Sequence, residues 1–434
     1  MERLACGHTA LVGPSRVCAH LISDSGDVDV EYLRVLTGTA LRWDLCCKQC
    51  DSAGSLELIE VCEGCVARVD EEQEYNLLGW RGTPGILERP EPYDPTITAT
   101  PLPRSLHTAV DIAPAVDRPG LWLVLTAEGA IAGWDVDKDS ATVLATAAVP
   151  DESGGEGWAG HVVRPTLHAS ADGRFAAVVN DFARHGAVLD LSTGETTMVL
   201  DGGDHHAETV PFSLAFARHE DRTVVVHRTA WNRLDATDPA TGELLTDRSQ
   251  PPFRGTQPRP EHYLDYFHGR VLVSPDGQWI ADDGWVWSPV GLPALWSLQR
   301  WLAADRWESE DGPTRQVLCQ RAYYWNGPMC WIDRNRLAIG GIGIDDEAML
   351  DGVRIFDAET GAQTGAFAGP RGRFHADGHR IYAATPDGLE IWDPDTGERT
   401  ATIPGFSPTH HHTGSGELAV LRDGELLRWR TGRR

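Results

Sequence analysis

Cysteine and histidine residues near the start of the chain have the types and spacing of metal ligands. Seven of the nine cysteines lie between residues 6 and 65, and with two histidines they form the pairs Cys6-x-His8, Cys18-x-His20, Cys47-x-x-Cys50 and Cys62-x-x-Cys65. Two closed tetrahedral zinc sites need eight ligands of this kind. Complete coordination leaves no position for a reactive water, so the sequence predicts two structural zinc ions rather than a catalytic centre.

The order of the four pairs leaves open which ligands share an ion. One ion could take the first two pairs and the other ion the two Cys-x-x-Cys pairs, or a cross-braced arrangement could form. Cys46 is the odd cysteine and could replace Cys47 as a ligand. The alternative to zinc is a set of reduced structural thiols. Since so small a module has little apolar core, metal would supply most of its folding free energy.

The charge of the chain restricts the class of partner. The net charge is −26 at pH 7, and residues 1–75 contain fourteen acidic residues against six lysines and arginines. A finger that reads DNA needs basic side chains for the phosphates, so we expect no binding to nucleic acid and no attraction to an anionic membrane. The acidity favours a basic protein partner, or serves solubility alone.

The order of the ligand pairs loosely resembles the zinc fingers of the ubiquitin-protease type, which also open with a Cys-x-His pair. The resemblance covers the ligands alone, and the later histidine ligands of that family have no counterpart in this sequence. It implies a zinc-binding module and carries no ubiquitin-binding function.

Two kinds of turn recur from about residue 105 onward. The pattern Asp-x-x-Thr-Gly occurs at residues 190–194, 238–242, 357–361 and 393–397. A second turn ending in Asp-Gly precedes it and occurs at residues 170–173, 274–277 and 375–378. Glycine supplies the positive φ that such turns need, and the aspartate accepts hydrogen bonds from the turn backbone. Four strands joined by two such turns and a loop are one propeller blade.

Seven such units are found, at residues 106–150, 162–201, 210–248, 263–303, 321–368, 373–404 and 407–433. They predict a mainly β fold, a seven-bladed β-propeller preceded by a small zinc-binding domain. The predicted organisation is a Cys/His module at residues 1–78, a linker with a ring-closing strand at 79–104 and the propeller at 105–434. The turns resemble those of bacterial WD40-like and YVTN-type propellers over most of residues 105–433, which implies the fold and leaves the function open.

The last unit stops at its third strand, and the exposed strand edge would be an aggregation hazard. Residues 96–100 show β-branched alternation just before the first unit. We therefore predict that residues 96–100 pair antiparallel with residues 424–430 and close the ring. Four prolines among residues 81–95 predict an extended linker along the ring.

The long loops of the predicted ring carry many aromatic and acidic residues. In a propeller the tight turns share one face, and the loops between second and third strands and between blades share the other. Eight of the sixteen tryptophans lie between residues 279 and 331. Tryptophan is a common binding anchor, and carboxylates beside it would select a basic peptide or a cationic ligand. The candidate contact residues are Trp285, Trp307, Trp325, Asp282, Asp283, Glu308, Asp345 and Asp346. The alternative is that these tryptophans fill the space between blades.

Histidines of the predicted first strands form another candidate site, because first strands line the central channel of a propeller. His168, His375 and His411 could converge on a metal ion there. This arrangement would suit the alternative function, a metal-dependent hydrolase or lyase with its site in the channel. The plain interpretation is that the imidazoles are hydrogen-bonded to backbone or water.

The leading hypothesis for function is a non-enzymatic scaffold whose zinc module and long-loop face contact protein partners. The sequence contains no Gly-rich phosphate loop and no Gly-x-Ser-x-Gly motif. It also shows no secretory signal and no run of about 18 apolar residues, so we expect a cytoplasmic protein with reduced cysteines. The oligomeric state is not fixed by the sequence.

Overall fold

The computed structural model describes residues 5–7, 15–22, 30–36, 43–53, 58–72, 76–82, 85–152, 160–249, 253, 258–343, 346 and 349–432. Strands account for 50% of the residues and helices for 9%. Within these ranges, no helix is long and apolar enough to cross a membrane.

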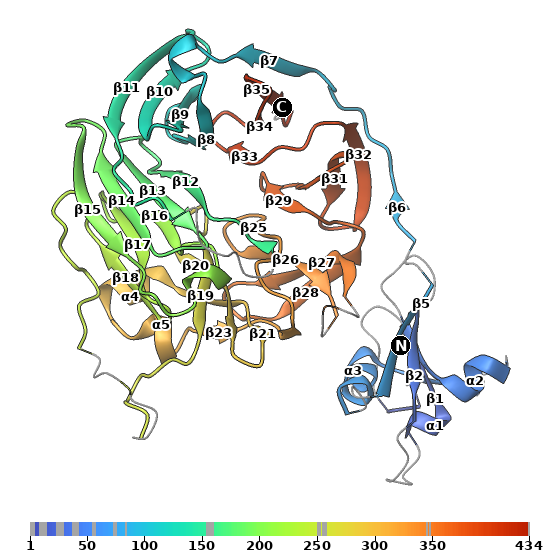
Figure 1. Cartoon of the computed structure of the whole chain (residues 1–434). Helices are drawn as coiled ribbons and strands as arrows, with labels where there is room; N and C mark the ends of the chain where they lie inside the picture. Colours follow the sequence, from blue (N-terminus) through green and yellow to red (C-terminus); the bar gives the residue numbers. More distant parts are fainter. Residues whose placement is uncertain are drawn as a thin grey trace.

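Seven sheets in the described part of the chain stand around a common axis and form a seven-bladed β-propeller (Figure 1). The first strands of neighbouring blades contact each other around the axis. Blade 1 contains β8 (Ala109–Pro114), β9 (Leu121–Thr126), β10 (Ala130–Asp135) and β11 (Ser140–Thr146). Blade 2 contains β12 (Arg164–Ala169), β13 (Phe175–Asp181), β14 (His185–Asp190) and β15 (Glu195–Asp201). Blade 3 contains β16 (Leu214–His219), β17 (Arg222–Ala230) and β18 (Arg233–Thr237).

Blade 4 is the most elaborate blade of the ring. It contains β19 (Phe267–Val273), β20 (Trp279–Val286), β21 (Val290–Gly291), β22 (Ala294–Ser297), β23 (Gln316–Val317) and β24 (Arg321–Ala322), with the helices α4 (Leu298–Ala303) and α5 (Glu308–Asp311). Blade 5 contains β25 (Met329–Trp331), β26 (Arg336–Ile342), β27 (Leu350–Asp357) and β28 (Gln363–Ala368). Blade 6 contains β29 (Arg373–Ala376), β30 (Ile381–Thr385), β31 (Gly388–Asp393) and β32 (Glu398–Pro404), and blade 7 contains β33 (His410–His412), β34 (Glu417–Arg422) and β35 (Glu425–Arg430).

In blades 2, 5 and 6 the Asp-x-x-Thr-Gly turn joins the third and fourth strands, as the sequence predicts, whereas in blade 3 it joins β18 to the single bridge at Leu244. In blade 2 the backbone N–H of Gly194 donates to the carbonyl of Asp190 at 2.8 Å, and the Asp190 carboxylate accepts from the N–H of Ser192 at 2.9 Å. Gly194 has φ +78°, a left-handed conformation that side chains with a Cβ rarely adopt. The turn chemistry therefore sets the register of each outer hairpin.

Large aromatic side chains fill the spaces between blades. Trp122 and Trp134 of blade 1 are buried in one cluster with Leu426 of blade 7. Trp392 of blade 6 is buried in another cluster with Ile355 of blade 5. Among the tryptophans between residues 279 and 331, Trp296 is buried in a cluster with Val224 of blade 3, and Trp331 in a cluster with Leu295 of blade 4. These two contacts agree with the alternative interpretation, that such tryptophans fill the space between blades.

The ring closes through a strand that precedes the first blade. Strand β7 (Ile97–Pro101) pairs antiparallel with β35, with Ile97 opposite Trp429 and Pro101 opposite Glu425. This confirms the predicted closure. The preceding segment runs along the ring, because β6 (Leu87–Glu88) adds a parallel fifth strand to blade 6 and the Tyr93 hydroxyl donates to the carbonyl of Thr402 at 2.6 Å.

Blade 3 has three strands in the described residues, with a single further bridge between Thr237 and Leu244. Side chains, in place of a fourth strand, form hydrogen bonds with backbone groups along the outer edge of β18. The Thr246 hydroxyl accepts from the backbone N–H of Ala236 at 2.9 Å, and Arg248 donates to the carbonyl of Leu234 at 2.8 Å. This edge is therefore not open for pairing with another strand.

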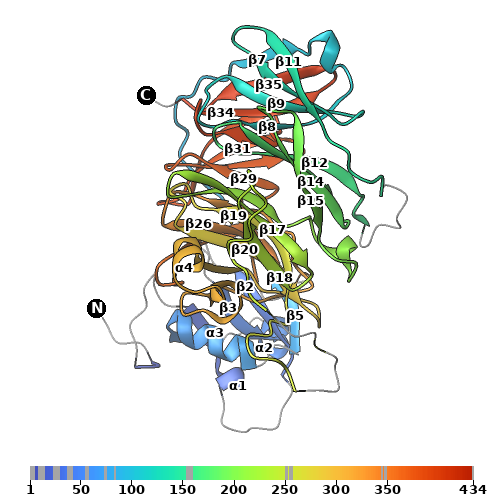
Figure 2. The ribbon, with the colours of Figure 1, turned by 90° about the vertical axis from the view of Figure 1, so that its left-hand side faces the viewer.

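The N-terminal module is a separate five-stranded sheet, connected to the ring through β6 (Figures 1 and 2). Its strands lie in the order β4 (Leu58–Val61), β1 (Ser15–Cys18), β3 (Trp43–Cys47), β2 (Tyr32–Leu36) and β5 (Leu77–Arg81), with helices α1 (Ala19–Ile22), α2 (Lys48–Ala53) and α3 (Glu63–Glu72). Strand β5 extends this sheet past residue 78. One small cluster of buried residues forms its core.

Candidate functional site

Four predicted metal ligands meet where two strands of the module end. Strands β1 and β3 are adjacent and parallel. β1 ends at Cys18 and α1 carries His20, whereas β3 ends at Cys47 and α2 carries Cys50. Because adjacent parallel strands end at the same edge of a sheet, the topology brings these two ligand pairs together.

The distances among these four ligands fit one tetrahedral metal ion. Cys18 Sγ lies 3.6 Å from Cys47 Sγ and 3.5 Å from Cys50 Sγ, and His20 Nδ1 lies 3.3–3.6 Å from the three sulfurs. Zinc bonds of about 2.0–2.3 Å place tetrahedral ligands about 3.5–3.8 Å apart. Burial raises the pKa of Cys18, but hydrogen bonds involving His20 outweigh burial and lower this pKa to about 7. The thiolate that a metal binds is therefore favoured.

Three further cysteines form a second cluster. The sulfurs of Cys6, Cys62 and Cys65 lie within 4.8 Å of one another. Cys62 immediately precedes helix α3 and Cys65 lies in its first turn, while the backbone N–H of Cys62 donates to Cys6 Sγ at 3.4 Å. The predicted fourth ligand, His8, lies outside the described residues. Both clusters could hold a metal ion.

The ligand pairs combine in a nested order. Cys6 of the first pair shares its cluster with the fourth pair, and the second pair shares its cluster with the third. The sequential arrangement considered from the sequence is therefore not formed. Cys46 belongs to neither cluster: its thiol lies 3.5 Å from the carbonyl oxygen of Cys47 in the module core, and burial raises its pKa to about 11.

Trp285 lies in the interior of the ring and not on the long-loop surface. Its side chain is 0% exposed and stacks against Phe267 at 4.5 Å and Trp325 at 4.9 Å between ring centroids. The expectation that Trp285 contacts a partner is therefore wrong in this structure. The physical reason is that Trp325, from the segment after β24, covers it.

The aspartates of β20 and the glutamate of α5 are also buried, which corrects the expected acidic surface at Asp282, Asp283 and Glu308. Asp282 Oδ2 lies 2.6 Å from His268 Nδ1, and Asp283 accepts from Arg321 Nη2 at 2.9 Å. Glu308 accepts from the backbone N–H six residues further along at 2.7 Å. These carboxylates hold the insertions of blade 4 together, so their charge is not offered to a partner.

The remaining predicted contact residues lie nearer the surface. Trp307 and Trp325 are half-buried, and Asp346 is exposed. The backbone N–H of Asp346 donates to the carbonyl of Ala322 at 3.0 Å, which places Asp346 beside β24. Asp345 lies outside the described residues.

Seven aromatic rings form a continuous cluster on the long-loop side of blades 2 to 5. We call this cluster the aromatic platform; its members are His205, His206, Trp231, Phe267, Trp285, Trp287 and Trp325. Trp287 is its outward end: the side chain is 65% exposed, and its ring lies 5.5 Å from each of the rings of Trp285 and His206. Tyr323, which is 60% exposed, follows β24, and its backbone N–H donates at 2.9 Å to the carbonyl of Pro289, two residues after Trp287.

Sequence reasoning singled out neither Trp287 nor Tyr323. The available signal was position: Trp287 directly follows the last residue of β20 and precedes Ser288 and Pro289, so it begins the loop. His205 of the platform is exposed, and its ring stacks on Phe267 at 5.7 Å.

The three channel histidines come from β12, β29 and β33, but they do not form a metal centre. The rings of His375 and His411 lie 6.2 Å apart, and His375 Nε2 is 3.4 Å from the carbonyl of Pro408. In the described residues, the groups that could hold a metal are the two cysteine clusters of the module. Burial lowers the pKa of His168 and, together with His411 and Arg373, that of His375, which keeps these imidazoles neutral.

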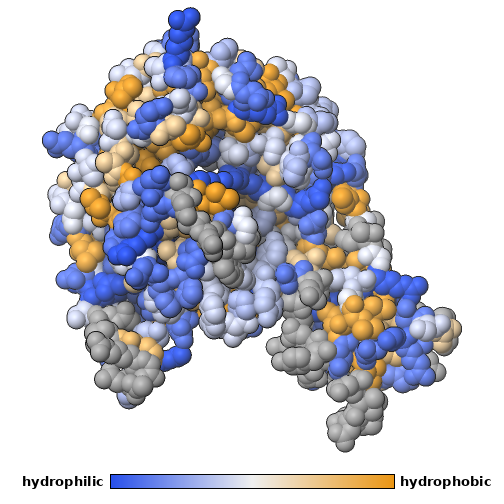
Figure 3. Space-filling view, viewed as in Figure 1, coloured by the Kyte–Doolittle hydropathy of each residue, from blue (hydrophilic) through white to orange (hydrophobic). Residues whose placement is uncertain are grey.

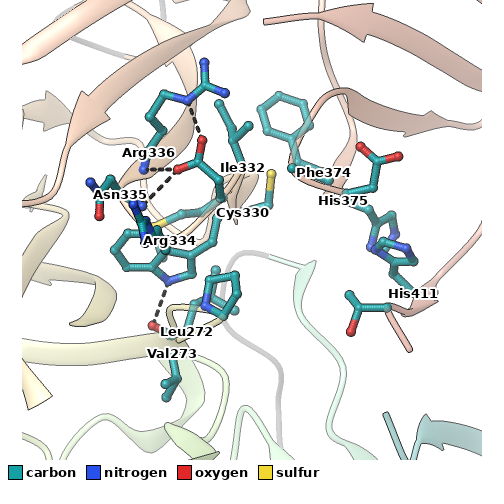
Figure 4. Close-up of a pocket in the computed structure, with 18 of the residues that line it drawn as sticks. Leu272, Val273, Cys330, Ile332, Arg334, Asn335, Arg336, Phe374, His375 and His411 are labelled. Carbon is teal, nitrogen blue, oxygen red and sulfur yellow. Dashed lines mark hydrogen bonds and ion pairs between the residues drawn. The ribbon is translucent and has the colours of Figure 1, made fainter. Parts of the chain in front are cut away.

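A cavity of about 1020 Å³ opens on the tight-turn face of the ring (Figure 4). Turns of blades 4 to 7 surround it, and Arg270, His375 and His411 lie in its wall. At its rim Arg336 donates to the Asp333 carboxylate at 2.7 Å. Figure 3 shows the ring hollowed around its centre. The contact residues predicted from the sequence lie in the long loops, on the opposite face of the ring.

Comparison with known proteins adds a likeness in fold alone. No known protein family matches the sequence, and no curated protein does. Among the solved structures that match is a chain from a crystal structure of the mitotic checkpoint complex, with 16% identity, a TM-score of 0.47, and coverage of 81% of this chain and 98% of that chain. A likeness at this level carries no functional argument. A function for this protein is therefore argued from its own surfaces and side-chain clusters.

Proposed function

We propose that the protein is a non-enzymatic interaction scaffold whose aromatic platform binds a lysine- or arginine-bearing segment of a protein partner. The observation that carries this proposal is the exposed ring of Trp287, which packs against the buried Trp285 and stacks on His206, with the exposed Tyr323 on the neighbouring segment. A rigid, preorganised aromatic side chain loses little entropy on binding, which is why such residues dominate binding energies.

The charge around the platform supports a basic partner. Asp204 precedes the two platform histidines; its side chain is 89% exposed and lies 4.0 Å from Arg184, a contact at the outer limit of an ion pair. Asp346 is exposed beside the segment that carries Tyr323. Exposed carboxylates next to an accessible indole attract cationic side chains through charge pairing and cation–π contact.

The module contributes a second rigid body, for which we propose two structural zinc ions. Thiolates and an imidazole at tetrahedral distances suit zinc, which would hold the strand ends and helix starts together without an open coordination position. Such ligands persist as thiols in a reducing compartment, so we propose a cytoplasmic location.

Selection of binding peptides from a random display library tests the platform. We expect the enriched peptides to carry lysine or arginine, and Trp287→Ala to weaken their binding by about 2 kcal/mol, which is about thirtyfold. Tyr323→Ala should weaken binding less, and Asp346→Asn should reduce its salt dependence. Affinities are measured by calorimetry with each variant.

Val199→Ala is the matched control, because Val199 is 81% exposed on the outer strand of blade 2 and lies outside the platform. Peptides that bind Trp287→Ala as tightly as the unmodified protein would refute the proposed surface. Enrichment of peptides without basic residues would refute the proposed partner chemistry.

A further inference from the structure

Three arginines lie on first strands of alternate blades and therefore near the axis. Arg164 is on β12, Arg270 on β19 and Arg373 on β29. Arg270 also lies in the wall of the 1020 Å³ cavity. The protein has a net charge of −26, so positive guanidinium groups gathered on its inner wall indicate a local need for positive charge.

Two of these arginines have no carboxylate partner in the described part of the chain. Arg373 donates to the carbonyl of Thr409 at 2.9 Å, and Arg270 donates to the carbonyl of Met329 at 3.4 Å. Neither forms an ion pair with a described residue, although many other arginines of the ring do. A guanidinium carries five N–H donors, so most of their donor capacity is not used by these bonds.

The carboxylates near the axis are already engaged. Asp181 accepts from the Thr166 hydroxyl at 2.8 Å and from the backbone N–H of Phe212 at 3.1 Å. Asp111 accepts from the backbone N–H of Leu167 at 2.8 Å. Asp181 also pairs with Arg164 at 4.0 Å, and Asp283, which attracts Arg270, is paired with Arg321. Three engaged carboxylates therefore stand against four guanidinium groups, which leaves the inner wall with an excess of positive charge.

The basic groups repel one another. Burial and then the neighbouring Arg270 and Arg164 lower the pKa of Arg373 to about 10, and burial lowers that of Arg270. Both groups still carry their charge at neutral pH. Nearby, the buried Nε2 atom of His168 has no protein hydrogen-bond partner among the described residues. An anion would relieve the repulsion and accept these hydrogen bonds.

We propose that the central channel binds a small phosphate-bearing anion between Arg270 and Arg373, with entry through the cavity on the tight-turn face. The planar, forked guanidinium group matches the oxygen geometry of phosphate, and two such groups from different blades can bind it from two sides. The aspartates at the rim leave the path open to an anion, because their charges are engaged in turns: Asp333 pairs with Arg336, and Asp377 accepts from the N–H groups of the β29–β30 turn.

The same positive charges disfavour a divalent metal ion at the axis. A cation placed near Arg270, Arg373 and Arg164 would be repelled at distances where salt screens only weakly. The channel site is therefore distinct in chemistry from the metal clusters of the module and independent of the aromatic platform.

Calorimetric titration with inorganic pyrophosphate at constant ionic strength tests the site. We expect saturable binding of one pyrophosphate per chain, and at least tenfold weaker binding by Arg270→Gln and by Arg373→Gln. Arg104→Gln is the matched control, because Arg104 is exposed outside the channel and its loss changes the net charge equally. Elemental analysis after each titration checks that pyrophosphate has not removed metal from the module.

The unliganded variants separate binding from folding. Because each removes a repelled charge, we expect Arg270→Gln and Arg373→Gln to melt at or above the temperature of the unmodified protein. If one variant fails to fold, Arg270→Lys, which keeps the charge and removes the fork, is expected to fold and bind more weakly. Absence of saturable binding by the unmodified protein, unchanged affinity in these variants, or equal binding of citrate would overturn the phosphate site.

Discussion

At the scale of single residues, buried charge is tolerated in this protein where a partner is fixed by the fold. Asp283 and Arg321 are both buried and joined by a 2.9 Å hydrogen bond, although 38 residues separate them in the chain. Removing one partner of such a pair leaves an isolated buried charge, which typically costs about 3–5 kcal/mol. The acidic residues of blade 4 therefore stabilise its insertions, and the exposed Asp346 is available for a partner.

The inner-wall histidine His410 gives the ring a specific acid sensitivity. Burial, and then repulsion from Arg373 and His168, lower its pKa from 6.5 to about 3. As the pH falls below 6.5, the unfolded chain takes up a proton at this residue and the folded ring does not. Stability therefore falls with pH between about 6.5 and 3, by a contribution on the order of 2 kcal/mol at about pH 4.5.

Urea unfolding of the ring at about pH 7 and pH 4.5 measures this effect. We expect the unmodified protein to lose more stability than His410→Gln, by the contribution given above. The other charged or titratable groups facing His410 are present in both proteins and cancel in the comparison; they are Arg164, Arg270, Arg373, His168 and Asp111. Equal losses in the two proteins would show that His410 is protonated in the folded ring.

At the scale of elements, β7 completes blade 7 with residues from the other end of the propeller. A variant that begins at residue 85 keeps β6 and β7, so we expect its ring to melt as in the full chain. A variant that begins at residue 102 exposes the edge of β35. We expect it to melt about 5 °C lower, equivalent to about 3–4 kcal/mol for a domain of this size, and to aggregate.

Differential scanning calorimetry and light scattering of the two truncated variants measure these outcomes. A third variant that begins at residue 95 lacks β6 and keeps β7, and it isolates the contribution of the tether along blade 6. If the chain beginning at residue 102 melts with the full-length ring, the ring does not depend on closure by β7.

The same elements show how far sequence reasoning reaches. The turns are predictable because their chemistry is local: glycine at positive φ and an aspartate side chain within five residues define them. Closure by β7 is predictable because an unpaired edge has to be paired. The ligand pairing of the module is not predictable from spacing, because it depends on the parallel neighbours β1 and β3, which approach through tertiary structure.

The sequence predicted the region of the candidate surface but not which of its aromatic residues are exposed. Trp285 and Trp287 stand two residues apart in the same acidic motif, and only tertiary cover by Trp325 decides which of the two is exposed. Likewise, the partners of Asp282 and Asp283 come from other strands. The channel arginines were not considered, because a sequence does not show which basic side chains of the first strands lack a carboxylate partner.

At the scale of the whole molecule, two bodies of different stability are joined by one tether. The ring has interlocking clusters of buried aromatic and aliphatic residues between successive blades. The module has one small cluster, in which several of the buried residues are the candidate metal ligands Cys18, Cys47 and Cys50. Structural zinc supplies about 10–16 kcal/mol to small metal domains, so metal should decide the folding of the module and leave the ring unaffected.

Chelation tests this division directly. We expect two zinc ions per chain by elemental analysis, and their removal by an excess chelator to unfold residues 5–82 while the thermal transition of the ring remains. Cys47→Ser should lose one ion, because Cys47 lies 3.6 Å from both Cys18 Sγ and His20 Nδ1. Cys46→Ser is its control and should keep both ions, since Cys46 lies in neither cluster. Limited proteolysis followed by mass spectrometry locates the unfolded part. Loss of the ring transition on chelation would show that the ring depends on the metal, and loss of an ion from Cys46→Ser would reassign the ligand.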